Sequence, residues 1–259
     1  MSSRTGRRAV VTGAGRGIGA AVARALAGEG AEVVLAARTL EAIEELAAIL
    51  RDQGFGAVAV PCDVTSEESV EILAREVGRS GAAPDILVNN AGVARAAPLA
   101  RTTLEEWNAL MAVNATGTFL CTRAFLPGMV ERGWGRVVNV ASVAGLVGER
   151  YVAAYTAAKH AVVGLTRAVA AEVAGKGVTV NAVCPGYVDT PLTDANTARV
   201  MERTGRTREE AVEALLASVG QKRLVRPEEV AHAVSSLCAD AAGSVNGTCL
   251  VVDGGAIRR

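Results

Sequence analysis

Aromatic side chains are scarce in this chain of 259 residues and make up only 3% of it. Half of the residues are hydrophobic, so the apolar material is mainly alanine, valine and leucine. Small aliphatic side chains suit helices that pack closely on both faces of a parallel sheet, and this length fits one large α/β domain. The lack of aromatics therefore does not exclude a large core, and we expect a single domain over residues 1–259.

Excess charge of either sign is also lacking. The 27 Lys and Arg residues are balanced by 27 Asp and Glu residues, and no long block of one sign occurs. A protein that binds a phosphate backbone usually carries a basic surface. We therefore expect no nucleic-acid partner.

Metal-ligand and disulfide patterns are missing as well. The five cysteines are odd in number, widely spaced and form no Cys-x-x-Cys pair: Cys62, Cys121, Cys184, Cys238 and Cys249. The two histidines, His160 and His232, have no partner at metal-ligand spacing. We expect buried reduced thiols, structural histidines and no metal site.

Long apolar runs are absent from the sequence. After a basic start, the apolar stretch Ala9–Val11 is too short for a signal peptide. No run approaches the ~20 apolar residues of a membrane span. The expectation is a cytoplasmic protein with no membrane partner.

Short valine-rich runs alternate with longer segments of helical period along the whole chain, which is the pattern of βαβ units. Most of the runs are continuously apolar, as in strands covered on both faces. They predict a single-domain Rossmann-type, doubly wound parallel sheet of about seven strands flanked by helices. The expected strands are Arg8–Thr12, Glu32–Ala37, Ala57–Pro61, Ile86–Asn89, Arg136–Ala141, Val178–Val183 and Cys249–Val252.

Helical spacing appears between these runs. One helix is expected from Ala20 to Ala27, another from Leu40 to Leu50 before Gly54, and longer ones over Thr103–Leu126 and Tyr151–Ala174. The charged stretch from about Thr190 to Arg226 interrupts the alternation of strand and helix segments but keeps apolar residues at helical spacing. Insertions after the carboxyl ends of strands lie over the ligand crevice of such sheets, so this stretch predicts a helical substrate lid.

A glycine-rich turn, Thr12-Gly13-Ala14-Gly15-Arg16-Gly17-Ile18-Gly19, directly follows the first expected strand and opens a helix. In that context backbone N–H groups and a helix N-terminus can meet a pyrophosphate. The key glycines are Gly13, Gly17 and Gly19. Tight packing of a helix on a strand also needs small residues, so the turn alone does not decide between cofactor binding and packing.

The end of the second expected strand indicates which dinucleotide would bind. An NAD site places an Asp or Glu there to bind the ribose hydroxyls, whereas this chain has Ala37 followed by Arg38. Arg38, with Arg16 from the glycine turn, can pair with a 2′-phosphate. NADP(H) is therefore the expected cofactor. NAD(H) is the alternative if both arginines are merely solvated.

Tyr155 and Lys159 are four residues apart on an expected helix and so share a face. A free phenol has a pKa near ~10, and a nearby ammonium would lower it toward the range of a general acid/base. Such a pair also arises by chance on surfaces. Tyr151 is the competing tyrosine, but four residues after it stands Tyr155 rather than a lysine, so we assign Tyr151 to the substrate pocket or the surface.

The sequence resembles the short-chain dehydrogenase/reductase family along nearly its whole length. The motifs that carry this resemblance stand in family order: the glycine turn, Cys62-Asp63-Val64, Asn89-Asn90-Ala91-Gly92, Asn114, Ser142, Tyr155-Thr156-Ala157-Ala158-Lys159 and Pro185-Gly186. Agreement at so many separated sites does not arise by chance.

The resemblance implies a role for each catalytic residue. Tyr155 would exchange the proton of the carbonyl or alcohol oxygen, and Ser142 would donate a hydrogen bond to that oxygen. Lys159 would hold the nicotinamide ribose and lower the tyrosine pKa, and Asn114 would connect Lys159 to a water chain. From the residues alone, Asn114 could equally cap or kink its helix, and Ser142 could be a strand-end turn former.

The same resemblance implies the cofactor contacts. Asp63 would meet the adenine, Asn90 to Gly92 would line the cleft, and Pro185 to Val188 with Thr190 would hold the nicotinamide end. The full expected set is Gly13, Arg16, Gly17, Ile18, Gly19, Arg38, Asp63, Val64, Asn90, Ala91, Gly92, Tyr155, Lys159, Pro185, Gly186, Val188 and Thr190.

The expected reaction is hydride transfer between NADP(H) and a ketone or secondary alcohol, as in similar β-ketoacyl-thioester and polyketide ketoreductases. The motifs are also similar to those of hydroxyacyl-CoA dehydrogenases and broad-range carbonyl reductases. The alternative function is an NAD-dependent secondary-alcohol or hydroxyacyl-CoA dehydrogenase. Substrate choice would depend on Ala94–Leu99, Val143–Tyr151 and Tyr187–Arg206. A non-catalytic NADPH-sensing regulator is the distant alternative. Such a protein is expected to lose one of the four catalytic residues, and this chain keeps all four.

Assembly is expected as well. The helical segments Thr103–Leu126 and Tyr151–Ala174 are apolar on more than one face. The family resemblance implies that they pair across a dyad, so a homotetramer is predicted, with a dimer as the next choice.

Overall fold

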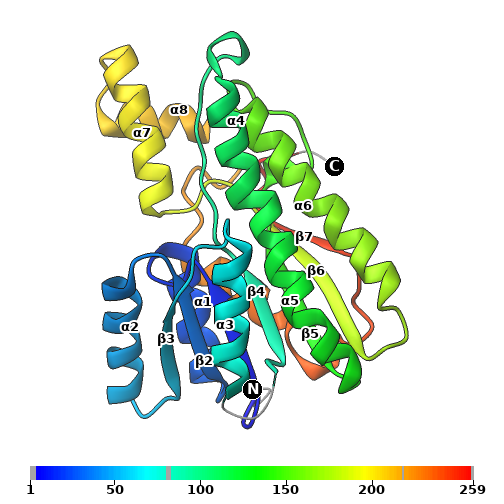
Figure 1. The fold of residues 1–259 in the computed structure, drawn as a ribbon. Coiled ribbons are helices and arrows are strands. Elements are labelled where there is room, and N and C mark those ends of the chain that lie inside the picture. Colours follow the sequence, from blue (N-terminus) through cyan, green and yellow to red (C-terminus); the bar gives the residue numbers. More distant parts are fainter. Residues whose placement is uncertain (1–3, 80–82, 218, 258–259) are drawn as a thin grey trace.

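The computed structural model describes residues 4–79, 83–217 and 219–257, so Met1–Ser3 at the start of the chain lie outside the description. Its centre is a seven-stranded sheet with the order β3-β2-β1-β4-β5-β6-β7, in which every neighbouring pair is parallel. Figure 1 shows the sheet between helical layers. The strands are β1 Arg8–Thr12, β2 Glu32–Ala37, β3 Ala57–Pro61, β4 Ile86–Asn89, β5 Gly135–Val140, β6 Val178–Pro185 and β7 Cys249–Val252. The predicted fold class is confirmed.

The helices divide between the two faces of the sheet. One buried cluster joins the strands to α1, α2 and α9, and a second joins them to α3, α5 and α6. The helices of these layers are α1 Gly17–Gly28, α2 Leu40–Asp52, α3 Glu67–Arg79, α4 Leu104–Met111, α5 Gly117–Glu131, α6 Ala153–Glu172 and α9 Pro227–Leu237. Helices α3 and α9 were not predicted from the sequence.

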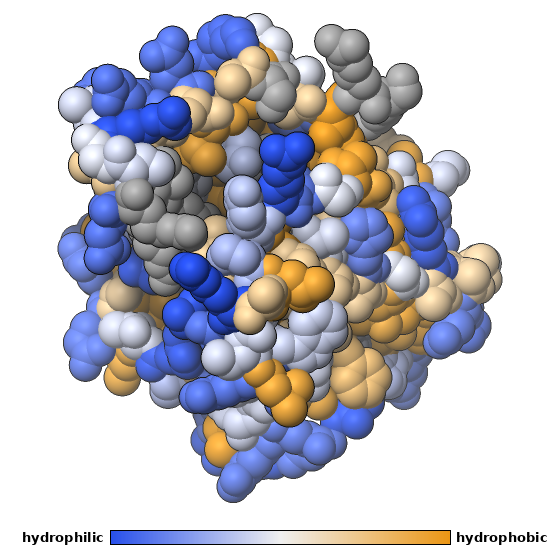
Figure 2. Space-filling view, turned by 90° about the horizontal axis from the view of Figure 1, so that it is seen from above, coloured by the Kyte–Doolittle hydropathy of each residue, from blue (hydrophilic) through white to orange (hydrophobic). Residues whose placement is uncertain are grey.

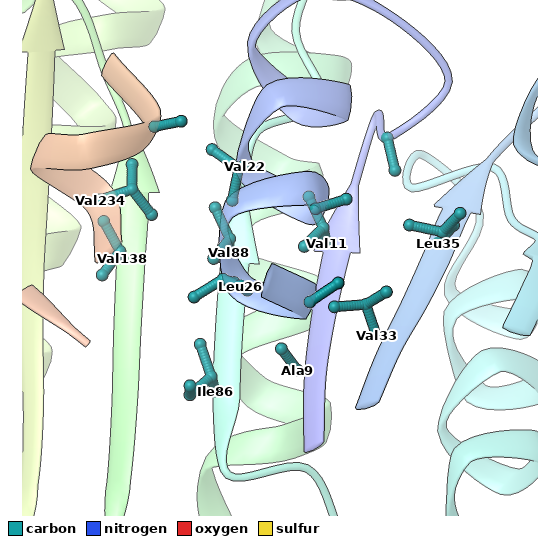
Figure 3. Close-up of a cluster of buried hydrophobic side chains, with 14 of the residues drawn as sticks. Ala9, Val11, Val22, Leu26, Val33, Leu35, Ile86, Val88, Val138 and Val234 are labelled. Carbon is teal, nitrogen blue, oxygen red and sulfur yellow. The ribbon is translucent and has the colours of Figure 1, made fainter. Parts of the chain in front are cut away.

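Strand β1 shows why the strands are continuously apolar. Side chains alternate between the faces of a strand, so Ala9 and Val11 enter the first cluster while Val10 enters the second. All three are fully buried. In Figure 3 Ala9 and Val11 lie beside Leu26 of α1 and Ile86 of β4, which together fill one face of the sheet.

A π-helical turn, Ala112–Thr116, joins α4 to α5. The sequence predicts one regular helix over Thr103–Leu126. The helical span instead contains this wider turn and continues to Glu131. The turn is stabilised by Asn114, whose side-chain amide donates to the Leu110 carbonyl four residues earlier.

The same helical span bears on membrane association. Among the described residues, Leu104–Glu131 alone is long and apolar enough to cross a membrane by length and composition, although the sequence had predicted no such span. In this fold 44% of its most apolar window is buried. Phe125 and Met129 belong to the core over the sheet. A helix that packs in a protein core can meet the same criteria of length and composition.

The limits of two strands and of α6 differ from the prediction. Strand β5 runs from Gly135 to Val140 rather than from Arg136 to Ala141, and β6 continues to Pro185 because its last residues pair with β7. Helix α6 begins at Ala153 rather than Tyr151, since the backbone of Tyr151 has a φ of 67°, which a right-handed helix cannot contain.

The predicted insertion forms two helices, α7 Pro191–Thr204 and α8 Arg208–Leu216, which stand apart from the sheet at the top of Figure 1. Residue 218 of this insertion lies outside the description. A parallel bridge between Val188 and Val225 joins the two ends of the insertion. The face seen from above mixes hydrophilic and hydrophobic side chains (Figure 2).

Candidate active site

The main cleft of the described structure lies at the carboxyl ends of the strands, around the point where the strand order reverses between β1 and β4. Open α/β sheets bind their ligands at this point. The cleft has a volume of about 500 Å³. Residues after β1, β2, β3, β4, β5 and β6 line it, and Pro191–Thr193 at the start of α7 close one side.

The glycine turn forms one wall of the cleft. Gly13 and Gly17 have φ values of 63° and 54°, a region that favours glycine. The Asn90 side chain donates to the carbonyls of Thr12 and Gly13 at 3.0 and 3.1 Å and so fixes the turn to the end of β4. Gly19 does not line the cleft. A Cβ there would lie 2.3 Å from the Gly13 carbonyl oxygen, so Gly19 serves the packing of α1 under the turn.

The start of α1 fits a phosphate group. Helix α1 begins at Gly17, and no side chain caps its first N–H groups. Gly13, Gly15 and Gly17 present no side chain to the cleft that they line. Open N–H groups at a helix N-terminus, reached over glycine backbone, favour an anion. The residues present therefore suit the pyrophosphate of a dinucleotide.

Two arginines stand at the same end of the cleft. Arg16 and Arg38 are both exposed and line the cleft, and neither forms an ion pair with another described residue. Ala37 at the end of β2 adds no negative charge. Asp63, a carboxylate that also lines the cleft, accepts hydrogen bonds from the backbone and side chain of Thr65, which together with Arg38 lower its pKa. This end of the cleft can accept a second phosphate.

Ser142 and Tyr155 meet at the other end of the cleft. Ser142 follows β5, and its Oγ accepts from the Ala144 N–H at 3.1 Å, so the hydroxyl is held at the start of a short turn. Burial raises the pKa of Tyr155 to about 12, although the Ser142 side chain nearby lowers it. At neutral pH the phenol therefore holds its proton.

Lys159 lies one turn after Tyr155 on α6 and is 5% exposed. Its Nζ is 5.7 Å from the centre of the Tyr155 ring and donates to the Val140 carbonyl at 2.8 Å. Burial lowers the pKa of Lys159 to about 8. The sequence had predicted that this ammonium lowers the tyrosine pKa. Lys159 is not among the groups that shift the Tyr155 pKa here, and its ammonium is directed to a backbone carbonyl, so this effect stays a prediction.

Asn114 is 1% exposed and lies between α4 and the segment after β4. Its Nδ2 donates to the carbonyls of Val93 and Leu110, both at 2.9 Å, and its Oδ1 accepts from Val93 N–H. A Cβ added at Gly92 would lie near both Asn114 Oδ1 and Lys159 Nζ, at 3.0 and 3.6 Å. Asn114 therefore distorts its helix and also stands beside the lysine.

The structure brings the candidate residues together. All of the expected catalytic and cofactor-contacting residues line one cleft, Gly19 excepted. Of the stretches expected to choose the substrate, Tyr187–Arg206 contributes lining residues, whereas Ala94–Leu99 and Val143–Tyr151 contribute none. Tyr151 is 60% exposed and does not line it. Further lining residues had not been predicted: Gly15, Ala37, Thr39, Ala42, Cys62, Val93, Val113, Val140, Ala141, Pro191, Leu192 and Thr193. Most are small or aliphatic neighbours of motif residues and carry no chemical signal of their own.

The cysteines and histidines of the described ranges are the remaining side chains that could bind a metal or react. No group of three His, Cys, Asp or Glu side chains there could hold a metal ion. The five cysteines are free; four are buried as predicted, and Cys249 is partly exposed. His160 lies exposed on α6 with its ring nitrogen 2.9 Å from the Thr156 carbonyl.

Comparison with known proteins agrees with this site. Residues 7–200 match the family model described as short chain dehydrogenase. The chain is 43% identical over 250 residues to cis-4-hydroxycyclohexanecarboxylate dehydrogenase of Sinomonas cyclohexanicum, covering 96% of each. It is 39% identical over 259 residues to a 3-oxoacyl-[acyl-carrier-protein] reductase of Synechocystis, covering 99% of each. The crystal structure of a single-substitution variant of actinorhodin polyketide ketoreductase with NADPH matches with a TM-score of 0.93 and 39% identity over 99% of both chains.

Proposed function

The chain belongs to the short-chain dehydrogenase family, and we propose that it is an NADPH-dependent carbonyl reductase in which Tyr155 donates the proton. One observation carries this proposal: Ser142 and Tyr155 line the same cleft as the glycine turn that suits a phosphate. NADPH, when bound, supplies the hydride. The gathering of all four catalytic candidates speaks against a regulator that only senses the cofactor.

The proton donor is explained by the state of Tyr155. Its raised pKa keeps the phenol protonated at neutral pH, which is the form needed to protonate a developing alkoxide. The Ser142 hydroxyl, fixed by Ala144 N–H, can then hydrogen-bond the same substrate oxygen. A phenol that holds its proton can therefore act as the donor in carbonyl reduction.

Lys159 and Asn114 would assist Tyr155 from the floor of the cleft. Lys159 is directed by its bond to Val140 toward the floor of the cleft, where a cofactor ribose would be held. Asn114 is bonded on three sides and fixes the segment after β4 that borders the lysine. We propose that the proton of Tyr155 is replaced through Lys159 and Asn114.

The proposed substrate is a ketone such as a 3-oxoacyl thioester or a polyketide. Its support lies in the relatives named for 3-oxoacyl-[acyl-carrier-protein] reduction and polyketide ketoreduction. The lid helices α7 and α8 would cover it, since the start of α7 already lines the cleft. NAD-dependent oxidation of a secondary alcohol or hydroxyacyl-CoA is the second candidate, and the relative named as a hydroxycyclohexanecarboxylate dehydrogenase favours it.

A panel of ketones and alcohols followed at 340 nm with both cofactors tests the function and the cofactor together. We expect kcat/KM with NADPH to exceed that with NADH by roughly ten- to a hundredfold, because a charge-assisted contact of Arg38 or Arg16 to the 2′-phosphate is worth about 1.5–3 kcal/mol. Changing Ala37→Asp together with Arg38→Ile should shift the preference toward NADH, since a carboxylate would repel that phosphate.

Arg24→Ile, which removes an exposed arginine of α1 outside the cleft, is the matched control and should leave the cofactor ratio unchanged. Equal efficiency with NADH in the unaltered protein would contradict the assignment of the two arginines. Activity only in the direction of alcohol oxidation would favour the second candidate.

We also propose a homotetramer, with a dimer as the next choice. Phe119 on α5 and Leu104 and Trp107 on α4 are 42%, 74% and 37% exposed, so this apolar helical surface is left uncovered in one chain. Symmetric pairing of such helices would bury it. Light scattering at micromolar concentration should report about four times the mass of the 26.5 kDa chain, and a monomer would refute the proposal.

A further inference from the structure

A buried polar pair joins strand β5 to helix α6 and takes no part in the mechanism above. Asn139 Nδ2 on β5 donates to Thr166 Oγ1 on α6 at 2.9 Å, and the Thr166 hydroxyl itself donates to the Val162 carbonyl at 2.8 Å. Both side chains are buried, and neither of them lines the cleft. The pair therefore does not touch substrate or cofactor, and any effect on the reaction must pass through the two elements that it joins.

The surroundings of this pair are aliphatic. Asn139 points to the same face of the sheet as Val137, two residues earlier, and Val137 packs in one buried cluster with Val169 of α6 and Val180 of β6. Aliphatic side chains can shift against one another at little cost, whereas a hydrogen bond fixes both a distance and a direction. The bond between Asn139 and Thr166 therefore defines where α6 lies along β5.

The same strand and helix carry reacting groups. Val140 directly follows Asn139, and its carbonyl accepts from Lys159 Nζ at 2.8 Å. Tyr155, Lys159 and Thr166 are spaced by four and by seven residues, so they share one face of α6. Two hydrogen bonds thus attach this face of the helix to β5. In the proposed mechanism Lys159 also reaches the cofactor ribose, so its own bond to β5 does not fix the helix alone.

We propose that Asn139 and Thr166 are positioning residues for the reaction. Their bond sets the place of α6 against β5, and with it the distance from the Tyr155 hydroxyl to a substrate oxygen held by Ser142, which follows the end of β5. This inference rests on the proposed carbonyl reduction. Rates depend steeply on such distances, since a displacement of about 1 Å caused far from the chemistry can cost roughly 10²-fold.

Thr166→Val tests the pair, because it removes the hydroxyl and keeps a branched side chain. Thr166→Ala replaces it if the valine variant does not fold, and Thr166→Ser is the conservative variant that keeps the hydroxyl. Thr122→Val on α5 is the matched control. The buried Thr122 hydroxyl also donates to a carbonyl four residues earlier, that of Thr118, at 2.7 Å, and accepts from Asn89 Nδ2 at 3.0 Å. The two threonines make the same bonds, but only α6 carries the proton donor.

Turnover is measured with the ketone of the panel that the unaltered protein reduces fastest, and is counted per NADPH-binding site so that unfolded protein does not contribute. Both valine variants should lower Tm by a similar amount, about 3–8 °C, since each leaves a buried amide without its acceptor. Thr166→Val should lower kcat per site at least about tenfold, whereas Thr122→Val and Thr166→Ser should stay within about threefold of the unaltered protein. An equal loss in both valine variants would overturn the positioning role.

Cofactor binding separates this inference from the proposed function. Because Lys159 moves with α6, the NADPH Kd, read from fluorescence without turnover, should rise about fivefold in Thr166→Val and stay within about twofold in Thr122→Val. Reduction of ketones with the same kcat per site in Thr166→Val as in the unaltered protein would overturn the positioning role alone. A protein that reduces no ketone of the panel would refute the proposed function, and the positioning role would then stand only on this difference in Kd.

Discussion

Replacing Tyr155 by phenylalanine is expected to reduce kcat by about 10⁴-fold or more while leaving the fold and NADPH binding nearly intact. General acid/base groups contribute roughly 10²–10⁴-fold, and this hydroxyl also orients the substrate oxygen beside Ser142. Among the residues that line the described cleft, no other phenol could replace it. The aromatic ring itself keeps its packing, because only the hydroxyl is removed.

The measurement is steady-state turnover of a ketone, together with thermal unfolding and the NADPH Kd by fluorescence. Tyr151→Phe is the matched control, since this tyrosine lies four residues earlier, is 60% exposed and does not line the cleft. It should retain full activity. If Tyr155→Phe kept more than about a tenth of the activity, the effect would be too small for an essential proton donor, and that assignment would be withdrawn.

Replacing Lys159 by methionine should have opposite effects on activity and stability. Turnover and cofactor affinity should fall, the former by at least about 10²-fold, because the ammonium is removed from the floor of the cleft. The folded protein should become more stable by about 2 kcal/mol at pH 7. Lowering the lysine pKa from 10.5 to about 8 corresponds to about 3 kcal/mol of destabilisation, and loss of the bond to Val140 offsets about 1 kcal/mol.

The pH dependence of this stability gain tests its cause. Between pH 8 and 10.5 the unfolded chain still binds the lysine proton while the folded chain has released it, so the stability of the unaltered protein rises with pH in this window. The advantage of Lys159→Met should therefore shrink by about 2 kcal/mol between pH 7 and pH 9.5 in denaturant unfolding. Lys176→Met, at an exposed lysine beyond α6, should show no such trend. A gain that is independent of pH would rule out desolvation as its cause.

Most of the fold could be predicted because its strands are covered on both faces. A run such as that of β1 must then be apolar at every position, and each such run between helical segments marks a strand. Five of the seven strands have the predicted limits. Motif spacing also located the site, since parallel strands bring their carboxyl ends to one edge, where Gly13, Asn90, Ser142 and Pro185 meet.

The parts that could not be predicted depend on contacts between distant segments. The sequence does not show that Gly19 packs under Gly13 rather than facing the cleft, because both functions require a glycine. The burial that raises the pKa of Tyr155 and lowers that of Lys159 exists only after folding. The single domain, the assembly and the cytoplasmic location stay predictions.

The π-helical turn at Ala112–Thr116 also limits how the length of this helix can change. The turn holds one residue more than an α-helical turn would need, and each residue of an α-helix rotates the following side chains by about 100°. A chain shorter by one residue here would close into a regular helix, and either α4 or α5 would then face the wrong neighbour. Asn114 would turn away from Val93, so a deletion that straightens the helix would dismantle the corner of the cleft beside Lys159.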